Sequence, residues 1–457
     1  MTNYFIYAIA FLVGIAFPVG PKRWLLTLVV SIAVDDVRFK GFALSNAILM
    51  ASIGSFCKSK YLLQIGGKVP AFAPISLLLL AATITMVLSE NPMEGIANYI
   101  SLCTLICVAL VTPSVINSRA DLRSSIRVVL WMSGLTSAGV LVESITYYVF
   151  GIQLKDNLFV LLNLEQDVLS STGFFSSNGL AGFHILPGLV LAAFLHSENI
   201  WAGSTRKLTS YTALGLLAAI LTFSRGTFFT IFLLLLVILY RKVTKTGGMR
   251  VIALVLLGAG VMIAPMGIEF IVGFNRGSFL ARYCILYGAV QSIRNNLFFG
   301  SGLGSRVYEE YPPTRWGEEA LWSGMELSEF ERDTHNTIVQ VAVDLGVAGL
   351  CCFAAMHVVL LKKWRRVGRT VQNLHAKRQA NALMCTLLVV EFFSLANSVL
   401  YTKPLWILFG LASAGLVCAE MSRKATIAEA EVAADEQRFP ARLAAITDAT
   451  TCPRQIE

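Results

Sequence analysis

The chain has 457 residues, of which 56% are hydrophobic and 14% are charged. A soluble domain carries about 25% charged residues, so the composition excludes an ordinary soluble protein. The net charge of +9 does not indicate nucleic-acid binding here, because membrane proteins concentrate Lys and Arg in cytoplasmic loops.

Apolar runs of membrane-spanning length follow one another along the chain. The first run, 4–17, lacks a basic region and a small-residue cleavage site, so we interpret it as a membrane helix rather than a signal peptide. A short run at 24–34 follows it. Four longer runs contain no Asp, Glu, Lys, Arg or His, namely 41–57, 71–89, 208–223 and 251–268. The sequence predicts an all-α fold, a polytopic transmembrane helical bundle of about 12 spans.

Basic residues assign the loops to the two sides of the membrane under the positive-inside rule. The predicted cytoplasmic groups are Lys58, Lys60 and Lys68; Arg119, Arg123 and Arg127; Arg206 and Lys207; Arg241, Lys242, Lys245 and Arg250; and the run 362–378. The intervening loops are acidic or neutral and are predicted to face the periplasm, namely 89–95, 155–172 and 273–335.

This alternation divides the chain into four parts. They are transmembrane helices in 1–272 (the first ten or so), a large periplasmic loop in 273–335, C-terminal transmembrane helices in 336–420 with a basic cytoplasmic loop at 362–380, and a polar cytoplasmic tail in 421–457, either helical or disordered.

An arginine interrupts the apolar stretch 208–240, in "LTFSRGTFF". One helix of that length would be about 50 Å long, whereas the hydrocarbon core is about 30 Å thick, so we expect a hairpin that turns at Ser224-Arg225-Gly226. Arg225 would then lie just below the outer surface. It either reaches the interface or pairs with a carboxylate, or it binds an anion such as pyrophosphate through its planar guanidinium.

The large loop opens with a predicted amphipathic helix over 279–293, led by Arg282 and Tyr283 and lying along the membrane surface. The run "FFGSGLGS" follows, and its glycines permit a ligand to approach the backbone. No strand precedes them, so a dinucleotide site is excluded. Aromatic and acidic residues over 307–334 suit a sugar-binding surface, and a solvated loop or interface anchoring explains them equally well.

A polar cluster, "DTHN", opens the apolar helix after the loop. We expect Asp333 or Thr334 to cap this helix. His335 is predicted on the outer side together with two arginines and Asn178, and an imidazole there can accept a proton from a sugar hydroxyl. Asp344, nine residues on, points to the opposite helix face and is predicted to be a packing or hydrogen-bonding group.

The remaining histidines, at 184, 196, 357 and 375, are interpreted as structural, and only His184 is placed to line an outer cavity. The nine cysteines form no CxxC pair, so neither a metal centre nor a disulfide framework is expected.

Four stretches, in order, resemble the superfamily of O-antigen ligases and O-antigen or exopolysaccharide polymerases, which are bacterial membrane glycosyltransferases. They are "STGFFSSNGLAGF" (171–183), "LTFSRGTFF" (221–229), "ARYCILYGAVQSIRNNLFFGSGLGS" (281–305) and "THNTIVQVAVDLGVAG" (334–349). The resemblance covers roughly 171–350. It departs from the family in "NNLFFG", where the family often has proline after the asparagine.

The resemblance implies metal-independent, cofactor-free transfer at the periplasmic face of the cell inner membrane. The donor would be a glycan on undecaprenyl pyrophosphate and the acceptor another glycan or a lipid-linked acceptor, with membrane lipids and a chain-length regulator as candidate partners. Arg225 and Arg282 would bind the pyrophosphate, and His335 would orient or deprotonate the acceptor. Further substrate contacts are expected from Asn178, Asn336, Gly302, Gly304 and Arg276.

Two other functions stay open. A ligase would transfer the finished glycan to lipid A-core or to a protein with the same catalytic residues, and polymerisation is favoured only because nothing marks the loop for a lipid A-core acceptor. A transporter or flippase is less favoured, because internal repeats are absent and the mid-span acids Glu143, Asp344 and Glu391 are not clustered.

Overall fold

A computed structural model describes most of the helical part of the chain. The described residues are 69–89, 92–116, 118–154, 158–161, 166–169, 171–172, 178–197, 205–222, 276–304, 336–395 and 397–450, with 9–13, 15, 24, 38–39, 42–43, 47–48, 50–51, 54, 224, 226–228, 230–232, 234 and 334.

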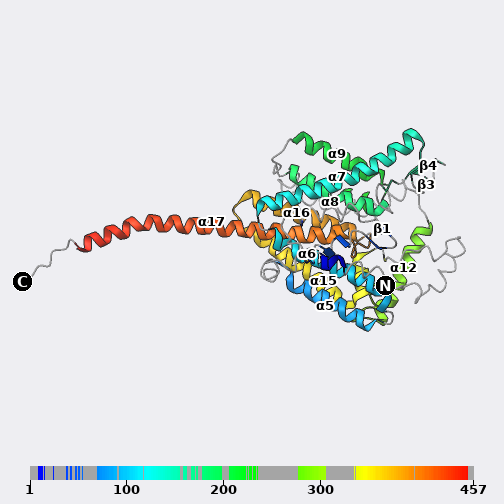
Figure 1. The fold of residues 1–457 in the computed structure, drawn as a ribbon, viewed down its shortest axis with the longest axis horizontal. Coiled ribbons are helices and arrows are strands. Elements are labelled where there is room, and N and C mark those ends of the chain that lie inside the picture. Colours follow the sequence, from blue (N-terminus) through cyan, green and yellow to red (C-terminus); the bar gives the residue numbers. More distant parts are fainter. Residues whose placement is uncertain are drawn as a thin grey trace, which may run out of the picture.

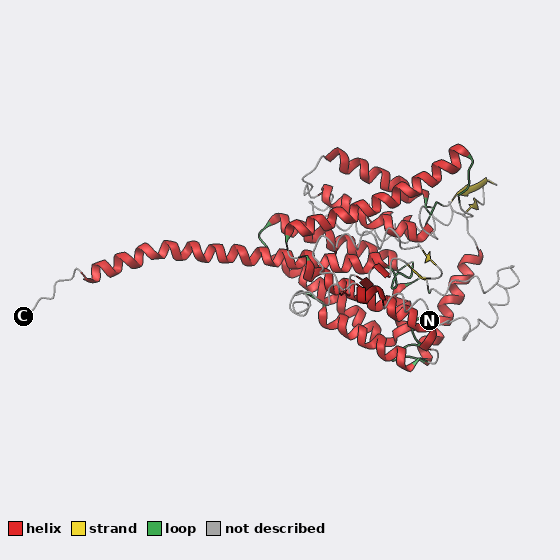
Figure 2. Cartoon of the chain, in the orientation of Figure 1, coloured by secondary structure: helices red, strands yellow, loops and turns green. Residues whose placement is uncertain are grey.

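Helices dominate this part of the structure (Figure 2). They are α5 (Phe72–Leu88), α6 (Pro92–Val115), α7 (Arg119–Phe150), α8 (Asn178–Ser197), α9 (Thr205–Leu221), α12 (Arg276–Asn295), α15 (Thr337–Thr370), α16 (Leu374–Ser394) and α17 (Lys403–Thr450). Two short antiparallel hairpins, which the sequence pattern did not predict, pair β1 (Arg38–Phe39) with β2 (Phe42–Ala43) and β3 (Leu158–Leu161) with β4 (Gln166–Leu169).

Four of the described helices are long and apolar enough to cross a membrane, which confirms a helical membrane protein. These segments are Gly95–Val115, Arg119–Phe150, Thr337–Thr370 and Lys403–Ala433, and Phe72–Leu88 and Leu180–Leu195 are shorter apolar helices. The predicted count of about 12 spans stays a prediction. The run 251–268 and most of 4–17 and 24–34 lie outside the described residues.

The helices form two groups around a central pair (Figure 1). Helices α7, α8 and α9 pack together on one side, and α5, α6 and α15 on the other, with α16 and α17 between them. Small residues allow close packing. A Cβ added to Gly188 of α8 would lie 2.4 Å from Ser133 Cβ of α7, and one added to Gly410 of α17 would lie 2.9 Å from Thr112 Cβ of α6. Such contacts are typical of helix interfaces in membranes.

Helix α7 shows how local sequence sets the helix ends. Ser118 caps its first turn by accepting a hydrogen bond from the Asp121 amide at 3.1 Å. Gly151 ends the helix in the left-handed conformation, with φ of 67°, and donates its N–H to carbonyls in the last turn. The polar N-terminal end and the glycine stop explain why this span runs from Arg119 to Phe150.

Two residues predicted on the cytoplasmic side lie together at one end of the bundle. Arg119 donates a hydrogen bond to Ser422 Oγ, and Lys363 Nζ lies 3.0 Å from Glu420 Oε2. Helix α17 leaves the bundle at this end and continues to Thr450 (Figure 1). Of the two alternatives for the tail, the helical one is therefore confirmed as far as Thr450.

Candidate functional site

Helix α15, the one that follows the polar cluster, is capped by Asn336. Asn336 Oδ1 accepts hydrogen bonds from the Ile338 and Val339 amides at 2.9 and 3.1 Å. The prediction of Asp333 or Thr334 as the cap is therefore wrong. The helix starts later than expected, at Thr337, so the asparagine occupies the extended capping position, where its side chain reaches the free amides of the first turn.

The start of α15 is fastened to the α16–α17 connection, which we define as residues 395–402. Asn336 Nδ2 donates to the Leu395 carbonyl at 2.9 Å, and Thr337 Oγ1 donates to the Asn397 carbonyl at 3.1 Å. The same threonine oxygen accepts from the Val399 amide at 2.9 Å. Asn336, predicted to contact substrate, therefore already uses its amide group within the protein.

Gly226, in the predicted turn at 224–226, lies against the end of α16 and the same connection. Helix α9 ends at Leu221, close to the expected position, and helical residues resume at Gly226. A Cβ on Gly226 would lie 2.4 Å from Asn397 Nδ2 and 3.0 Å from a ring carbon of Phe393. Arg225 is outside the described residues, but the residue after it is packed directly on this connection.

The start of α8 joins this assembly. A Cβ on Gly182 would lie 1.9 Å from Thr227 Oγ1, and the Phe183 ring stacks on Phe393 with centroids 5.0 Å apart. Asn178 is the first residue of α8, and the position of its side chain is not described. The first two of the resembling stretches therefore meet in space.

Helix α15 is interrupted at Gly346, whose φ of 63° and ψ of −164° are not helical. The turn that follows α12 hydrogen-bonds to the interruption. The Ser301 amide donates to the Val343 carbonyl at 2.8 Å, and the Val347 amide donates to the Leu297 carbonyl at 2.9 Å. Backbone groups freed by the break are thus satisfied by the residues around the glycine run.

The glycines of this run are packed against protein. A Cβ on Gly302 would lie 2.5 Å from Ser89 Oγ, and one on Gly304 would lie 1.8 Å from Asn98 Nδ2. Both also have positive φ, 110° and 74°. These contacts account for glycine at both positions, and the predicted substrate contact there stays a prediction.

Asp344 lies at the centre of the site and is 0% exposed. Its Oδ1 accepts hydrogen bonds from Gln340 Nε2 at 2.9 Å and from the Gly304 amide at 3.3 Å, and its Oδ2 accepts from the Tyr401 hydroxyl at 2.5 Å. The prediction of a hydrogen-bonding role is confirmed. Tyr401 was missed, because nothing in "VLYTKP" marks a residue that bonds to an acid 57 positions away.

Helix α12 confirms the predicted loop helix and extends it to Arg276–Asn295. Arg276 and Arg282 lie in its first half, where side chains are not described. Its second half packs on α15, with Ala289 against Val343. Both arginines therefore lie on a helix that is docked beside the start of α15.

His335, like Arg225, lies outside the described residues, whereas Thr334 and Asn336 on either side of it are described. The structure thus brings Gly226 and Thr337, which lie close to Arg225 and His335 in the sequence, to the same connection, and α12, which carries Arg282, packs on α15 through its second half. Within the described part of the chain, no three His, Cys, Asp or Glu side chains gather as a metal site requires.

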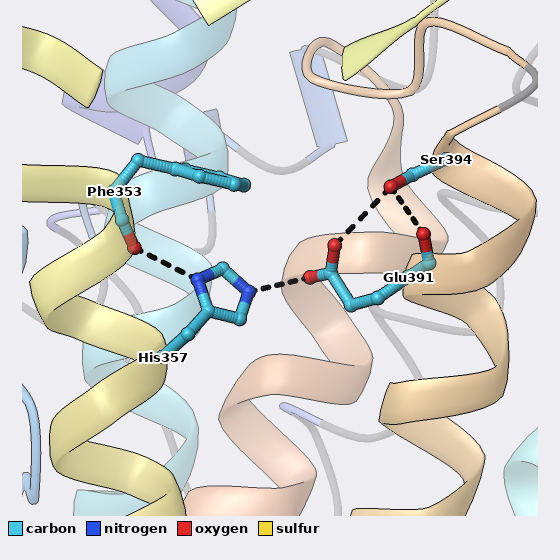
Figure 3. A network of polar contacts seen from close by, with 4 residues as sticks. All are labelled: Phe353, His357, Glu391 and Ser394. Atoms are coloured by element: carbon cyan, nitrogen blue, oxygen red, sulfur yellow. Dashed lines mark hydrogen bonds and ion pairs between the residues drawn. The ribbon is translucent and has the colours of Figure 1, made fainter. Parts of the chain in front are cut away.

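A second polar network ties α15 to α16 (Figure 3). His357 Nδ1 bonds to the Phe353 carbonyl at 2.8 Å and therefore carries a hydrogen, while Nε2 lies 2.7 Å from Glu391 Oε1. Ser394 donates to the other carboxylate oxygen at 3.2 Å. These contacts support the structural interpretation of His357.

His184 lines a mainly apolar pocket between α7, α8 and α17, beside Ser133, Pro187 and Pro404. Its Nδ1 bonds to the Leu180 carbonyl at 2.9 Å. The hydrogen bonds and packing contacts given above for the glycine run and for the start of α15 involve residues other than His184.

Fold and site together define a helical membrane protein with a polar assembly where α8, α15 and the α16–α17 connection meet. The family model described as O-antigen ligase matches residues 210–354, from α9 into α15. This match confirms the resemblance to the O-antigen ligase and polymerase superfamily, and it includes the 224–226 turn, α12, the glycine run and the His-Asn helix start. No curated protein matches the chain.

Proposed function

We propose that the protein is a glycosyltransferase that works at the periplasmic face of the bacterial inner membrane. Its donor is a glycan carried on undecaprenyl pyrophosphate, and it polymerises O-antigen or exopolysaccharide repeat units. The observation that supports this most strongly is the O-antigen ligase match over 210–354, because that segment holds both predicted catalytic arginines and His335.

The proposed reaction is a displacement at the anomeric carbon of the donor glycan. The acceptor hydroxyl forms the new glycosidic bond while the bond to pyrophosphate breaks, and His335 takes the hydroxyl proton. Negative charge grows on the departing pyrophosphate, and Arg225 and Arg282 stabilise that charge. Arg276 and Asn178 would contribute further contacts to the substrate.

The contacts of the described residues support a shared site for these groups. Gly226, directly after Arg225, packs on Asn397, and Thr337, two residues after His335, bonds to the same residue. Displacement chemistry requires the base and the leaving-group cations within one substrate's length, so the contact of the neighbours of Arg225 and His335 with one connection agrees with the proposal. Arg282 lies on α12, whose second half packs on α15.

Substitution in a strain that lacks the native gene tests the assignment. We expect His335→Ala, Arg225→Ala and Arg282→Ala each to abolish surface glycan extension at normal protein levels. The matched controls are His375→Ala and Arg369→Ala, which alter exposed residues of α16 and α15 in the predicted cytoplasmic region. Normal glycan in the first three variants would overturn the catalytic roles.

The acceptor class follows from the products that the deletion strain accumulates. Loss of a polymerase leaves single repeat units attached to their final acceptor, whereas loss of a ligase leaves full-length chains on the lipid carrier. We expect single units; full-length carrier-linked chains would establish the ligase alternative, with lipid A-core or a protein as the acceptor.

Labelling of single cysteines tests the orientation. Ser323→Cys, in the large loop, should react with a membrane-impermeant maleimide in intact spheroplasts, and Arg366→Cys, in the basic run, should react only after lysis. The opposite pattern would place the large loop in the cytoplasm and exclude a periplasmic site.

A further inference from the structure

A chain of side-chain hydrogen bonds runs through the first two turns of α15. The Thr334 amide donates to Gln340 Oε1 at 3.2 Å, and Gln340 Nε2 donates to Asp344 Oδ1 at 2.9 Å. The three residues are buried, with 8%, 2% and 0% of their surface exposed. The side-chain oxygen of Gln340 thus accepts a hydrogen bond at the entrance of the helix, and its side-chain nitrogen donates one to Asp344.

The Asp344 end of this chain is fixed from outside the helix. Tyr401 donates to Asp344 Oδ2 from the α16–α17 connection, and the Gly304 amide donates from the glycine run. The break at Gly346 follows two residues later, and the turn after α12 is hydrogen-bonded to it. Asp344 is therefore held by two elements outside α15, the glycine run and the α16–α17 connection.

At the other end, two hydrogen bonds of Thr334 to described residues are seen, the one to Gln340 and one within the helix entrance. Thr334 precedes the first helical residue by three positions, and its backbone N–H has no helical partner to bond with. Its hydroxyl donates to the Asn336 carbonyl at 2.8 Å, which is a local contact within the same short segment. Of these two contacts, only the bond to Gln340 reaches beyond the helix entrance.

We propose that Gln340 and Asp344 are positioning residues for the transfer reaction. By holding the Thr334 amide, they fix the backbone before His335 relative to the glycine run, whereas Asn336 and Thr337 fix the backbone after it to the α16–α17 connection. This inference rests on the proposed function only in giving His335 a catalytic role. Neither residue touches substrate in this proposal, and both act through the peptide that they hold.

The donor and acceptor roles in this series of hydrogen bonds allow a specific test. Gln340→Glu keeps an acceptor for the Thr334 amide but sets two carboxyl groups at hydrogen-bond distance, so repulsion replaces the link to Asp344 wherever both are ionised. Asp344→Asn alone keeps an acceptor for Gln340. In the double variant Gln340→Glu with Asp344→Asn, the new amide donates to the new carboxylate and restores the link with reversed polarity, while the Gly304 amide, which bonds to the same Asp344 oxygen, loses its acceptor.

Two measurements on purified protein in nanodiscs test the inference. The first is the initial rate as a function of donor concentration, with the lipid-linked glycan that accumulates in membranes of the deletion strain as the probe. We expect Gln340→Glu to lower kcat by about tenfold to a hundredfold with little change in KM, because misplaced groups lose rate rather than binding. The double variant should recover part of that rate, because it restores the link to residue 344 but not the bond from the Gly304 amide.

The second measurement is amide hydrogen exchange of peptides that cover 330–342. Gln340→Glu should speed exchange there and leave 374–394 of α16 unchanged, and the double variant should restore protection. Unchanged exchange, or a rate that the double variant does not recover, would overturn the positioning role. If His335→Ala instead proves active, the catalytic proposal fails, and the exchange data still decide whether the hydrogen-bond chain holds the helix entrance.

Discussion

Gly346 provides the most demanding test of this architecture. Its φ of 63° and ψ of −164° lie in a region that only glycine occupies readily. A Cβ there would lie 2.5 Å from the carbonyl carbon and oxygen of Phe298 and 2.6 Å from the Gly300 amide nitrogen. Gly346→Ala must therefore strain the backbone and push α15 away from the turn that follows α12.

The structure sets the size of the effect. The backbone conformation costs about 1–3 kcal/mol for a residue other than glycine. Separating the turn from the helix removes three backbone hydrogen bonds, from the Ser301, Val347 and Ala348 amides. At about 1 kcal/mol for each of these, the expected loss of folding free energy is about 5 kcal/mol.

Unfolding by SDS in mixed micelles measures this loss, and surface glycan in the complemented deletion strain measures its consequence. The matched control is Gly368→Ala in the same helix, where an added Cβ meets nothing within 4 Å. That control should be neutral or stabilise the protein by up to about 1 kcal/mol, because alanine is the better helix former. Equal stability and equal activity of the two variants would refute the close contact between the glycine run and the broken helix.

Two further predictions concern the helix entrance and the glycine run. Asn336→Ala and Asn373→Ala each remove a helix cap, at the starts of α15 and α16, and each should cost about 1 kcal/mol of stability. In a glycan assay only Asn336→Ala should lower activity. Equal activity of the two variants would show that the start of α15 is not part of the site. Gly304→Ala should lower the stability of the protein because the added methyl group clashes with Asn98, and adding Asn98→Ala should recover part of that loss in the same unfolding assay. If the double variant regains stability but stays inactive, a direct substrate contact at Gly304 is supported.

Local patterns in the sequence predicted the parts of the site that depend on neighbours along the chain. Apolar periodicity and span length predicted a helix over 279–293, within the observed α12, together with the interruption near 224–226 and the helix after the polar cluster. The hydrogen-bonding role of Asp344 followed from its helix position alone. Predicting these features requires only the periodicity of a helix and the thickness of a bilayer.

The missed parts depend on contacts between distant segments. Asn336, rather than Asp333 or Thr334, caps α15, and Tyr401 bonds to an acid on another helix. The break at Gly346 exists because a turn from residues 297–301 replaces its hydrogen bonds. No local pattern specifies which distant carbonyl will accept a given amide, so single-sequence reasoning found the glycines but assigned them to ligand approach alone.

The α16–α17 connection lies outside the segment that matches the O-antigen ligase family, yet it contacts that segment repeatedly. Asn397 packs on Gly226 and accepts a hydrogen bond from Thr337, and Tyr401 bonds to Asp344. Contacts within the matched segment therefore account for only part of its geometry. Since both the turn beside Arg225 and the helix that follows His335 rest on this connection, any shift of α16 relative to α17 would move the two together, and the connection belongs to the candidate site as much as the residues that the family match contains.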